Sequence, residues 1–127
     1  MILVFQSKNQ RLLSKTENKS FMTGEFDISK PKFTINNNNS NIVVTATNGN
    51  FIGENDILLK NNVLFESKNF KIYSNEVIFN KSNQTADSKS NSIFIAKGTK
   101  IKSEGFNIIE NGNLIKFNGK TILILSK

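Results

Sequence analysis

The chain of 127 residues contains no cysteine, no histidine and no tryptophan, and it has a single proline. The absence of cysteine excludes a disulfide framework and a thiolate metal site. The absence of histidine removes the usual zinc ligand, the most common general base, and the Ser-His-Asp and Cys-His catalytic arrangements. Composition alone therefore excludes most enzyme classes that work through a nucleophile and a base.

The chain also has no long hydrophobic run. The apolar segment Met1 to Phe5 is far shorter than the ~20 residues of a membrane-spanning helix, and it is too short for the core of a signal peptide. Residues 1–24 are otherwise polar, and we interpret them as a lead-in or as the remnant of a membrane anchor. We expect residues 25–127 to form a single domain.

Positive charge is in excess, with a formal net charge of +7, and every cationic residue except Arg11 is a lysine. A basic balance can attract nucleic acid or an anionic lipid surface. Specific readout of phosphates and bases favours the forked arginine side chain. We therefore expect no nucleic-acid partner and interpret the lysines as a solvated surface.

A pattern recurs along the chain with a period near 29 residues. Short apolar segments end in small residues at Ala46, Ser74 and Ser103, which are 28 and 29 residues apart. A second set of such endings falls at Ser67, Ala96 and Ser126. A fixed period of this size is typical of stacked supersecondary units that bury their apolar surface against their neighbours.

From Phe26 onward apolar and polar residues alternate with a period of two, which indicates β-strands. About a dozen short strands are separated by turn signals, including Asn61-Asn62 and Asn111-Gly112, and the second of these is the strongest hairpin signal. Pro31 lies just before the first clear strand, where a missing N–H is tolerated. The pattern predicts an all-β protein: a sandwich, a jelly roll or a β-solenoid.

The inward side of these strands is apolar throughout. Each such side chain taken alone is best explained as core, but together they would line a trough between stacked units. A closed trough is a core, whereas a partly open one is a groove for an acyl chain, whose burial contributes ~0.8 kcal/mol per CH₂. The expected lining consists of Phe33, Val44, Phe51, Leu59, Val63, Phe65, Phe70, Ile72, Phe79, Ile95, Ile101, Phe106 and Phe117.

The last predicted strand, Thr121 to Leu125, is apolar and has charge only at its flanks, Lys120 and Lys127. Two interpretations remain open from the sequence. The segment is either a central strand that comes last in the chain or an edge strand that stays free to pair with a partner sheet.

No catalytic motif is present. The glycines at 98, 105, 112 and 119 recur every seven residues, but none begins a phosphate-binding loop that leads into a helix, so we interpret them as turn glycines. The acidic residues are scattered, and a glycosidase-type pair of carboxylates is the one enzymatic alternative. We expect neither enzymatic activity nor a cofactor or metal.

The order and spacing of five motifs resemble a known family, the periplasmic lipopolysaccharide-transport bridge proteins, which comprise LptC, its relative LptA and the OstA-like domain. The resemblance covers residues 29–126, and the single-pass order of the motifs is closer to LptC than to LptA. The motifs are KPKF at 30–33, IVVTA at 42–46, DILLKNNVLF at 56–65, FKIYSNEVIFN at 70–80, taken as strand–turn–strand, and GTKIKSEGFNIIENGNLIKFNGK at 98–120.

The resemblance implies a twisted, partly open β-jellyroll of stacked antiparallel short strands on the periplasmic side of the inner membrane. Such a domain passes lipopolysaccharide, with its lipid A acyl chains in an apolar groove, from an inner-membrane ABC transporter complex to an LptA-type jellyroll. The transporter would meet the N-terminal edge and the next jellyroll the C-terminal edge. These edges correspond to Lys32, Phe33, Thr34 and Ile35, and to Thr121, Ile122, Leu123, Ile124 and Leu125.

One further residue follows from the same resemblance, and four lysines follow from the hypothesis of lipid transfer. Gly105 matches the family's glycine in its Ser-x-Gly element. Lysines near the groove mouth would meet lipid A phosphates as point charges, and the candidates are Lys60, Lys71, Lys100 and Lys102. LptC proteins normally begin with a transmembrane anchor, for which residues 1–5 offer at most a remnant.

The alternative is a β-sandwich or β-solenoid module that binds a carbohydrate or a protein partner without transporting lipid. A carbohydrate-binding module would present an exposed aromatic platform, and Tyr73 is the chain's only tyrosine.

Overall fold

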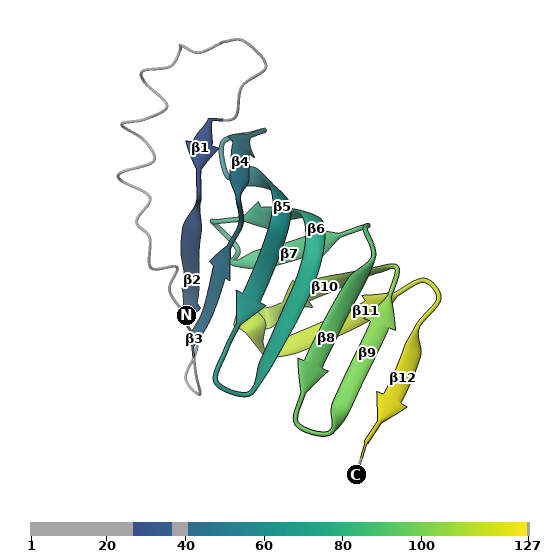
Figure 1. The fold of residues 1–127 in the computed structure, drawn as a ribbon. Coiled ribbons are helices and arrows are strands. Elements are labelled where there is room, and N and C mark those ends of the chain that lie inside the picture. The colour runs from purple at the N-terminus through teal and green to yellow at the C-terminus, as the bar shows by residue number, and fades with distance from the viewer. Residues whose placement is uncertain (1–26, 37–40, 127) are drawn as a thin grey trace.

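The computed structural model describes residues 27–36 and 41–126, and the N-terminal lead-in that was expected over residues 1–24 lies outside them. Within the described ranges the chain forms twelve β-strands and one short 3-10 helix (Figure 1). All twelve strands belong to one antiparallel sheet that does not close on itself. The all-β prediction is therefore confirmed.

The strands are short, apart from two of eleven residues each. They are β1 (Ile28–Ser29), β2 (Lys32–Asn36), β3 (Asn41–Thr45), β4 (Asn48–Phe51), β5 (Asp56–Glu66), β6 (Phe70–Asn80), β7 (Thr85–Ser88), β8 (Ser92–Ala96), β9 (Thr99–Ser103), β10 (Gly105–Ile109), β11 (Leu114–Asn118) and β12 (Ile122–Leu125), with the helix η1 (Glu110–Gly112) before β11.

The two long strands, β5 and β6, pair with each other and divide the sheet into two arms. The first half of β5 pairs with β4 and its second half with β3. The second half of β6 pairs with β7 and its first half with β8. The first arm therefore runs β1-β4-β5-β6-β7-β10-β11, and the second arm runs β2-β3-β5-β6-β8-β9-β12.

A β-bulge in β5 marks the division between the arms. The register between β5 and β6 shifts between Lys60 and Val63. Asn61 and Asn62 adopt φ values of 69° and 54°, in the left-handed region that asparagine tolerates better than most residues. Such a bulge bends its strand. The expected turn at Asn61-Asn62 is therefore wrong: these residues bend one continuous strand. Likewise, the segment 70–80, expected to be strand–turn–strand, is the single strand β6.

The core lies between the two arms, as the aromatic contacts show. The ring of Phe33, in the second arm, stacks on that of Phe79, in the first arm, with centroids 5.3 Å apart. Phe65 of β5 meets Phe106 of β10 edge-on at 5.5 Å. Aromatic pairs of this kind contribute about 0.5–1.5 kcal/mol beyond the apolar area that they bury. The two arms are therefore held together by phenylalanine pairs that face one another.

The hairpin predicted at Asn111-Gly112 is present, with a longer loop than the two-residue turn that this dipeptide favours. In β10 and β11 the last facing pair is Ile109 and Leu114, and the connection between them contains η1. Gly112 has a φ of 86°, which suits glycine. Pro31 directly precedes β2, as the sequence predicts.

Candidate functional site

A continuous apolar row crosses the inner face of the second arm. Its members are directly opposed across neighbouring strands, and opposed side chains lie on the same face of a sheet. From β2 to β12 the row consists of Phe33, Val44, Phe65, Ile72, Phe94, Ile101 and Leu123. It runs from one edge of the arm to the other.

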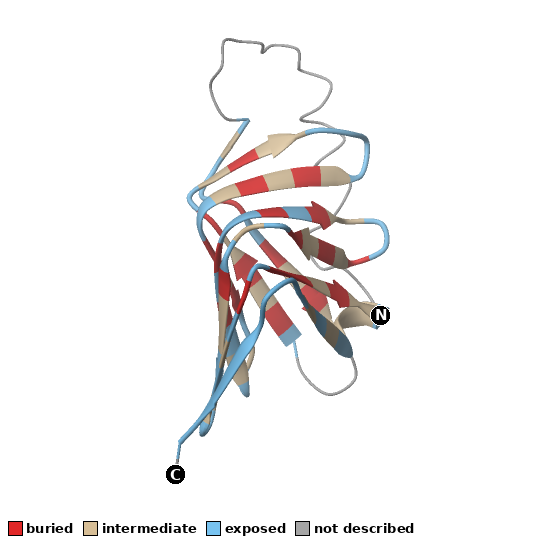
Figure 2. Cartoon of the chain, turned by 90° about the vertical axis from the view of Figure 1, so that its right-hand side faces the viewer, coloured by how far each residue is buried: buried red, intermediate tan, exposed pale blue. Residues whose placement is uncertain are grey.

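Burial changes along this row. Phe65 and Ile72 are fully buried, Phe94 and Ile101 are partly exposed, and 57% of Leu123 is exposed. Figure 2 shows the same trend, with buried residues gathered away from the C-terminus and exposed residues on the strands that lead to it. The first arm therefore covers the row less toward β12.

Two ends of the interior can be defined from this trend. The closed end comprises Phe33, Phe65, Phe79 and Phe106, whose side chains are buried. The open end comprises Phe70, Phe94, Phe117, Ile101 and Leu123. At the open end Phe94 stacks on Phe70 at 5.4 Å and meets Phe117 of the first arm edge-on at 5.5 Å.

The structure brings the expected lining residues together, with one exception. Eight are buried in the core: Phe33, Val44, Leu59, Val63, Phe65, Ile72, Phe79 and Phe106. Phe51, Phe70 and Phe117 are partly buried against that core, and Ile101 lies in the apolar row.

The exception is Ile95, which faces outward. It stands opposite Lys71 and Lys100 and is 39% exposed. Its neighbour Phe94 faces inward instead, as its contact with Phe117 shows. In the segment SIFIA both faces are apolar, so alternation could not decide which residues face the interior. Only the pairing of Phe94 with Ile72 of β6 decides it.

The lysines expected near a groove mouth lie on the outer face. Lys100 and Lys102 alternate with the inward Ile101 along β9, and successive side chains of a strand point to opposite faces. Lys71 alternates in the same way with Ile72 and forms an ion pair with Glu66 at 3.7 Å. Lys60 alternates with the buried Leu59. None of these four therefore points into the interior.

The two expected partner edges are both edge strands, and they are the two edges of the same arm. Among the described strands, β2 pairs only with β3 and β12 pairs only with β9. Among the described strands the last strand is therefore an edge strand and not a central one, while its pairing with a partner sheet stays a prediction. The edges differ in burial, because β2 buries Phe33 and Ile35, whereas all four residues of β12 are exposed.

Hydrogen-bond alternation shows which N–H groups of β12 point away from β9. The N–H of Ser126 donates to the carbonyl oxygen of Gly98 at 3.0 Å, and antiparallel ladders alternate bonded and non-bonded residues. Ile122 and Ile124 therefore direct their N–H groups toward β9. Leu123 and Leu125 direct theirs to the free edge.

Gly105 is required by a close backbone approach. A Cβ at this position would overlap the carbonyl oxygen of Ser88, which is backbone and cannot move aside. Gly105 begins β10, next to the pair of Phe106 and Ser88 that joins β10 to β7. The expectation that it is a turn glycine is therefore wrong, whereas Gly98, Gly112 and Gly119 have the positive φ values of turn glycines.

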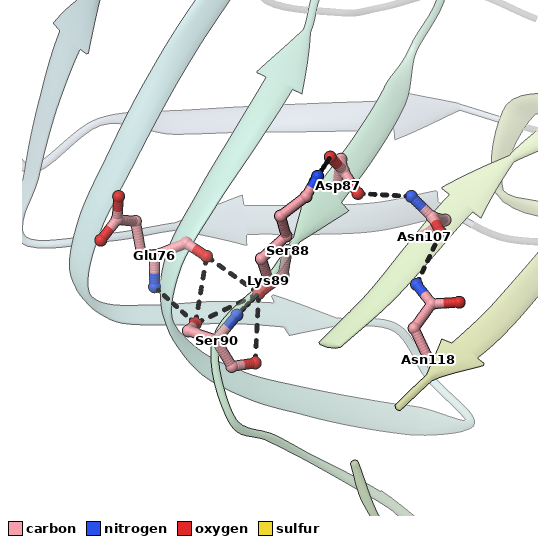
Figure 3. Close-up of polar contacts among 7 residues, drawn as sticks. All are labelled: Glu76, Asp87, Ser88, Lys89, Ser90, Asn107 and Asn118. Atoms are coloured by element: carbon pink, nitrogen blue, oxygen red, sulfur yellow. Dashed lines mark hydrogen bonds and ion pairs between the residues drawn. The ribbon is translucent and has the colours of Figure 1, made fainter. Parts of the chain in front are cut away.

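A cluster of serines lies where β6 passes from one arm to the other. The Ser74 hydroxyl lies 3.0 Å from that of Ser88, 2.9 Å from that of Ser90 and 3.0 Å from that of Ser92. Ser88 also donates to the carbonyl oxygen of Glu76 at 2.9 Å (Figure 3). These hydroxyl groups satisfy one another's hydrogen-bonding capacity. The cluster therefore forms a polar contact between β7 and β8.

The structure also revises the role of the small residues that mark the repeat. Ser74 stands in the middle of β6 and not at the end of a strand. Ser103 does end β9, where its hydroxyl donates to the carbonyl oxygen of Gly105 at 2.9 Å.

Amide side chains extend the polar contacts across the first arm. Asn107 donates to Asp87 at 2.5 Å and accepts from Asn118 at 2.7 Å (Figure 3). This ladder links β7, β10 and β11 on the face opposite Phe106. It stabilises the arm that covers the closed end.

A surface hollow of about 430 Å³ lies beside the outer face of the second arm. Its apolar wall includes Leu64, Tyr73 and Ile93, and its polar wall includes Asn62 and Asn75. Tyr73 is 42% exposed there. This hollow is the feature of the structure that best fits the alternative of a carbohydrate-binding module.

Within the described residues, no group of three or more acidic, histidine or cysteine side chains could hold a metal ion. No helix in that part of the chain has the length and apolarity to cross a membrane. Comparisons of the chain with models of protein families, with curated proteins and with solved structures gave no match.

Proposed function

We propose that this protein is a non-enzymatic lipopolysaccharide-binding and transfer module of the LptC kind. Its open sheet would be a twisted, partly open β-jellyroll on the periplasmic side of the inner membrane. It would receive lipopolysaccharide from an ABC transporter complex at β2. It would pass the lipid A acyl chains between its arms to an LptA-type jellyroll at β12.

The observation that carries the proposal is the apolar row and its graded burial. A stable core does not require an apolar strip that continues to a largely exposed edge residue, Leu123. An acyl chain entering beside Phe117 would cover Phe94, Ile101 and Leu123. Each CH₂ group buried there would contribute ~0.8 kcal/mol.

The placement of the edges supports the proposal. Because β2 and β12 are opposite edges of one arm, modules joined edge to edge would continue a single sheet. The apolar row of one module would then run on into that of the next. Leu123 would stand at the junction, where the exposed part of the row would present an acyl chain to the next module.

A photo-crosslinking amino acid at Leu123 tests the proposal. Ile78 is the matched control, because it is also an exposed aliphatic residue, at 38%, but it lies on the outer face of the first arm, between the inward Val77 and Phe79. With lipopolysaccharide we expect a strong adduct at position 123 and little at 78. Equal adducts at both positions would contradict the proposal and favour a closed binding module, with the hollow at Tyr73 as its site.

A further inference from the structure

The outer face of the last three strands of the second arm carries a patch that lipid uptake between the arms does not use. Two cross-strand rows form it. In one, Lys102 of β9 stands between Ile93 of β8 and Ile122 of β12. In the other, Lys100 stands between Ile95 and Ile124. We call these six residues the lysine–isoleucine patch.

The patch is uniform in charge and is exposed except at Ile93, which is partly buried. It contains no acidic residue, and neither Lys100 nor Lys102 forms an ion pair with another described residue. Ile95, Ile122 and Ile124 are between 39% and 49% exposed. Lys100 therefore stands between two exposed isoleucines, whereas Lys102 stands between the exposed Ile122 and the partly buried Ile93.

We propose that the lysine–isoleucine patch docks the protein on the surface of an anionic phospholipid bilayer. Lysine ammonium groups are attracted to anionic headgroups within about a Debye length of the surface. Aliphatic side chains between them enter the boundary between headgroups and acyl chains, as the apolar face of a peripheral helix does. Lysine stems lie along apolar surface while their ends reach the phosphates.

Charge complementarity together with the isoleucines selects this occupant. A single-stranded nucleic acid would offer the same phosphates, but its successive bases would call for a series of aromatic stacking partners. The patch itself has only aliphatic side chains and borders one exposed aromatic residue, Tyr73, which stands opposite Ile93. A bilayer surface satisfies both components, because it presents negative charge above an apolar layer. The patch lies on the face opposite Leu123. This proposal can therefore be tested independently of lipid uptake between the arms.

The test measures co-sedimentation of the full chain with phosphatidylcholine vesicles that contain phosphatidylglycerol, and with vesicles of phosphatidylcholine alone. We expect binding to the anionic vesicles that weakens as salt rises. Lys100→Gln combined with Lys102→Gln should weaken it about thirtyfold. The matched control is Lys68→Gln with Lys116→Gln, which removes the same charge from exposed lysines outside the patch and should weaken binding less than about threefold.

A second double variant, Ile95→Ser with Ile124→Ser, should lower the binding that remains at high salt, since it removes only the apolar component. Far-UV circular dichroism of each variant checks that the sheet is intact. Equal binding to both kinds of vesicle, no binding to either, or equal losses in the patch and control pairs would overturn the proposal. None of these outcomes depends on lipopolysaccharide, so failure here is distinguishable from failure of the transfer proposal.

Discussion

The closed and open ends of the interior use the same kinds of residue, yet they differ in burial. Phe65 meets Phe106 edge-on at 5.5 Å, and Phe94 meets Phe117 nearly edge-on at the same distance. Phe65 is nonetheless fully buried, while Phe94 and Phe117 are partly exposed. The difference arises from how far the opposite arm covers each pair. Residue type alone therefore does not distinguish a closed hydrophobic core from the lining of a partly open groove.

The largest effect is expected from truncating the closed end. Phe65→Ala should lower the free energy of unfolding by about 3–5 kcal/mol, because it opens a cavity among fully buried side chains. Phe117→Ala should cost only about 1–2 kcal/mol, since part of that ring is already solvated. Urea denaturation of both variants measures the difference. Equal losses would remove the distinction between the two ends.

The next effect concerns the backbone contact beside Phe106. Gly105→Ala should destabilise the protein by about 1–3 kcal/mol, because the added methyl group overlaps the Ser88 carbonyl oxygen and forces β7 and β10 apart. Thermal unfolding measures this loss. Gly53→Ala is the control, since a Cβ there meets nothing closer than 3.8 Å. A stable Gly105→Ala variant would show that the two strands can separate without cost.

A smaller effect on stability, but a large one on association, is expected at the edge of the open end. Leu123→Pro removes an N–H that faces the free edge, so the fold should lose less than about 1 kcal/mol. Ile124→Pro removes one directed to β9 and should release β12 from the sheet. Pull-down with an LptA-type jellyroll should fail for both variants. Retained association of Leu123→Pro would exclude pairing through this edge.

Much of the fold could be predicted from the sequence, because alternation reports directly on strands. The hairpin at Asn111-Gly112 and the strand at Thr121 to Leu125 followed from local residue chemistry. The bulge at Asn61-Asn62 could not be told from a turn, since both use the same left-handed conformation. The strand β7 was hidden in a polar stretch, because its buried Ser88 is satisfied by hydroxyl partners that are distant in sequence.

The site was less predictable than the fold. In β8 the sequence SIFIA is apolar on both faces, so the inward Phe94 and the outward Ile95 could be distinguished only by pairing with β6. The lysines of β9 were expected at a groove mouth and lie on the opposite face. Gly105 was assigned to a turn, because a backbone contact with Ser88 leaves no local signal. In each case the deciding information is long-range.

The proposed lipid transfer depends most on acyl chains passing between the two arms at the open end. Cysteines can be placed at Phe94 and Phe117, which face each other across the arms, because the chain has no other cysteine. A short bifunctional thiol crosslinker then ties the two arms together. Leu58→Cys with Ile78→Cys, a facing pair on the outer side of the first arm, is the matched control.

The measurement is lipopolysaccharide binding by each variant before and after crosslinking. We predict that joining positions 94 and 117 abolishes binding, whereas joining 58 and 78 leaves it unchanged. Full binding with the arms tied together at 94 and 117 would contradict the account, because the acyl chains would then have to bind elsewhere.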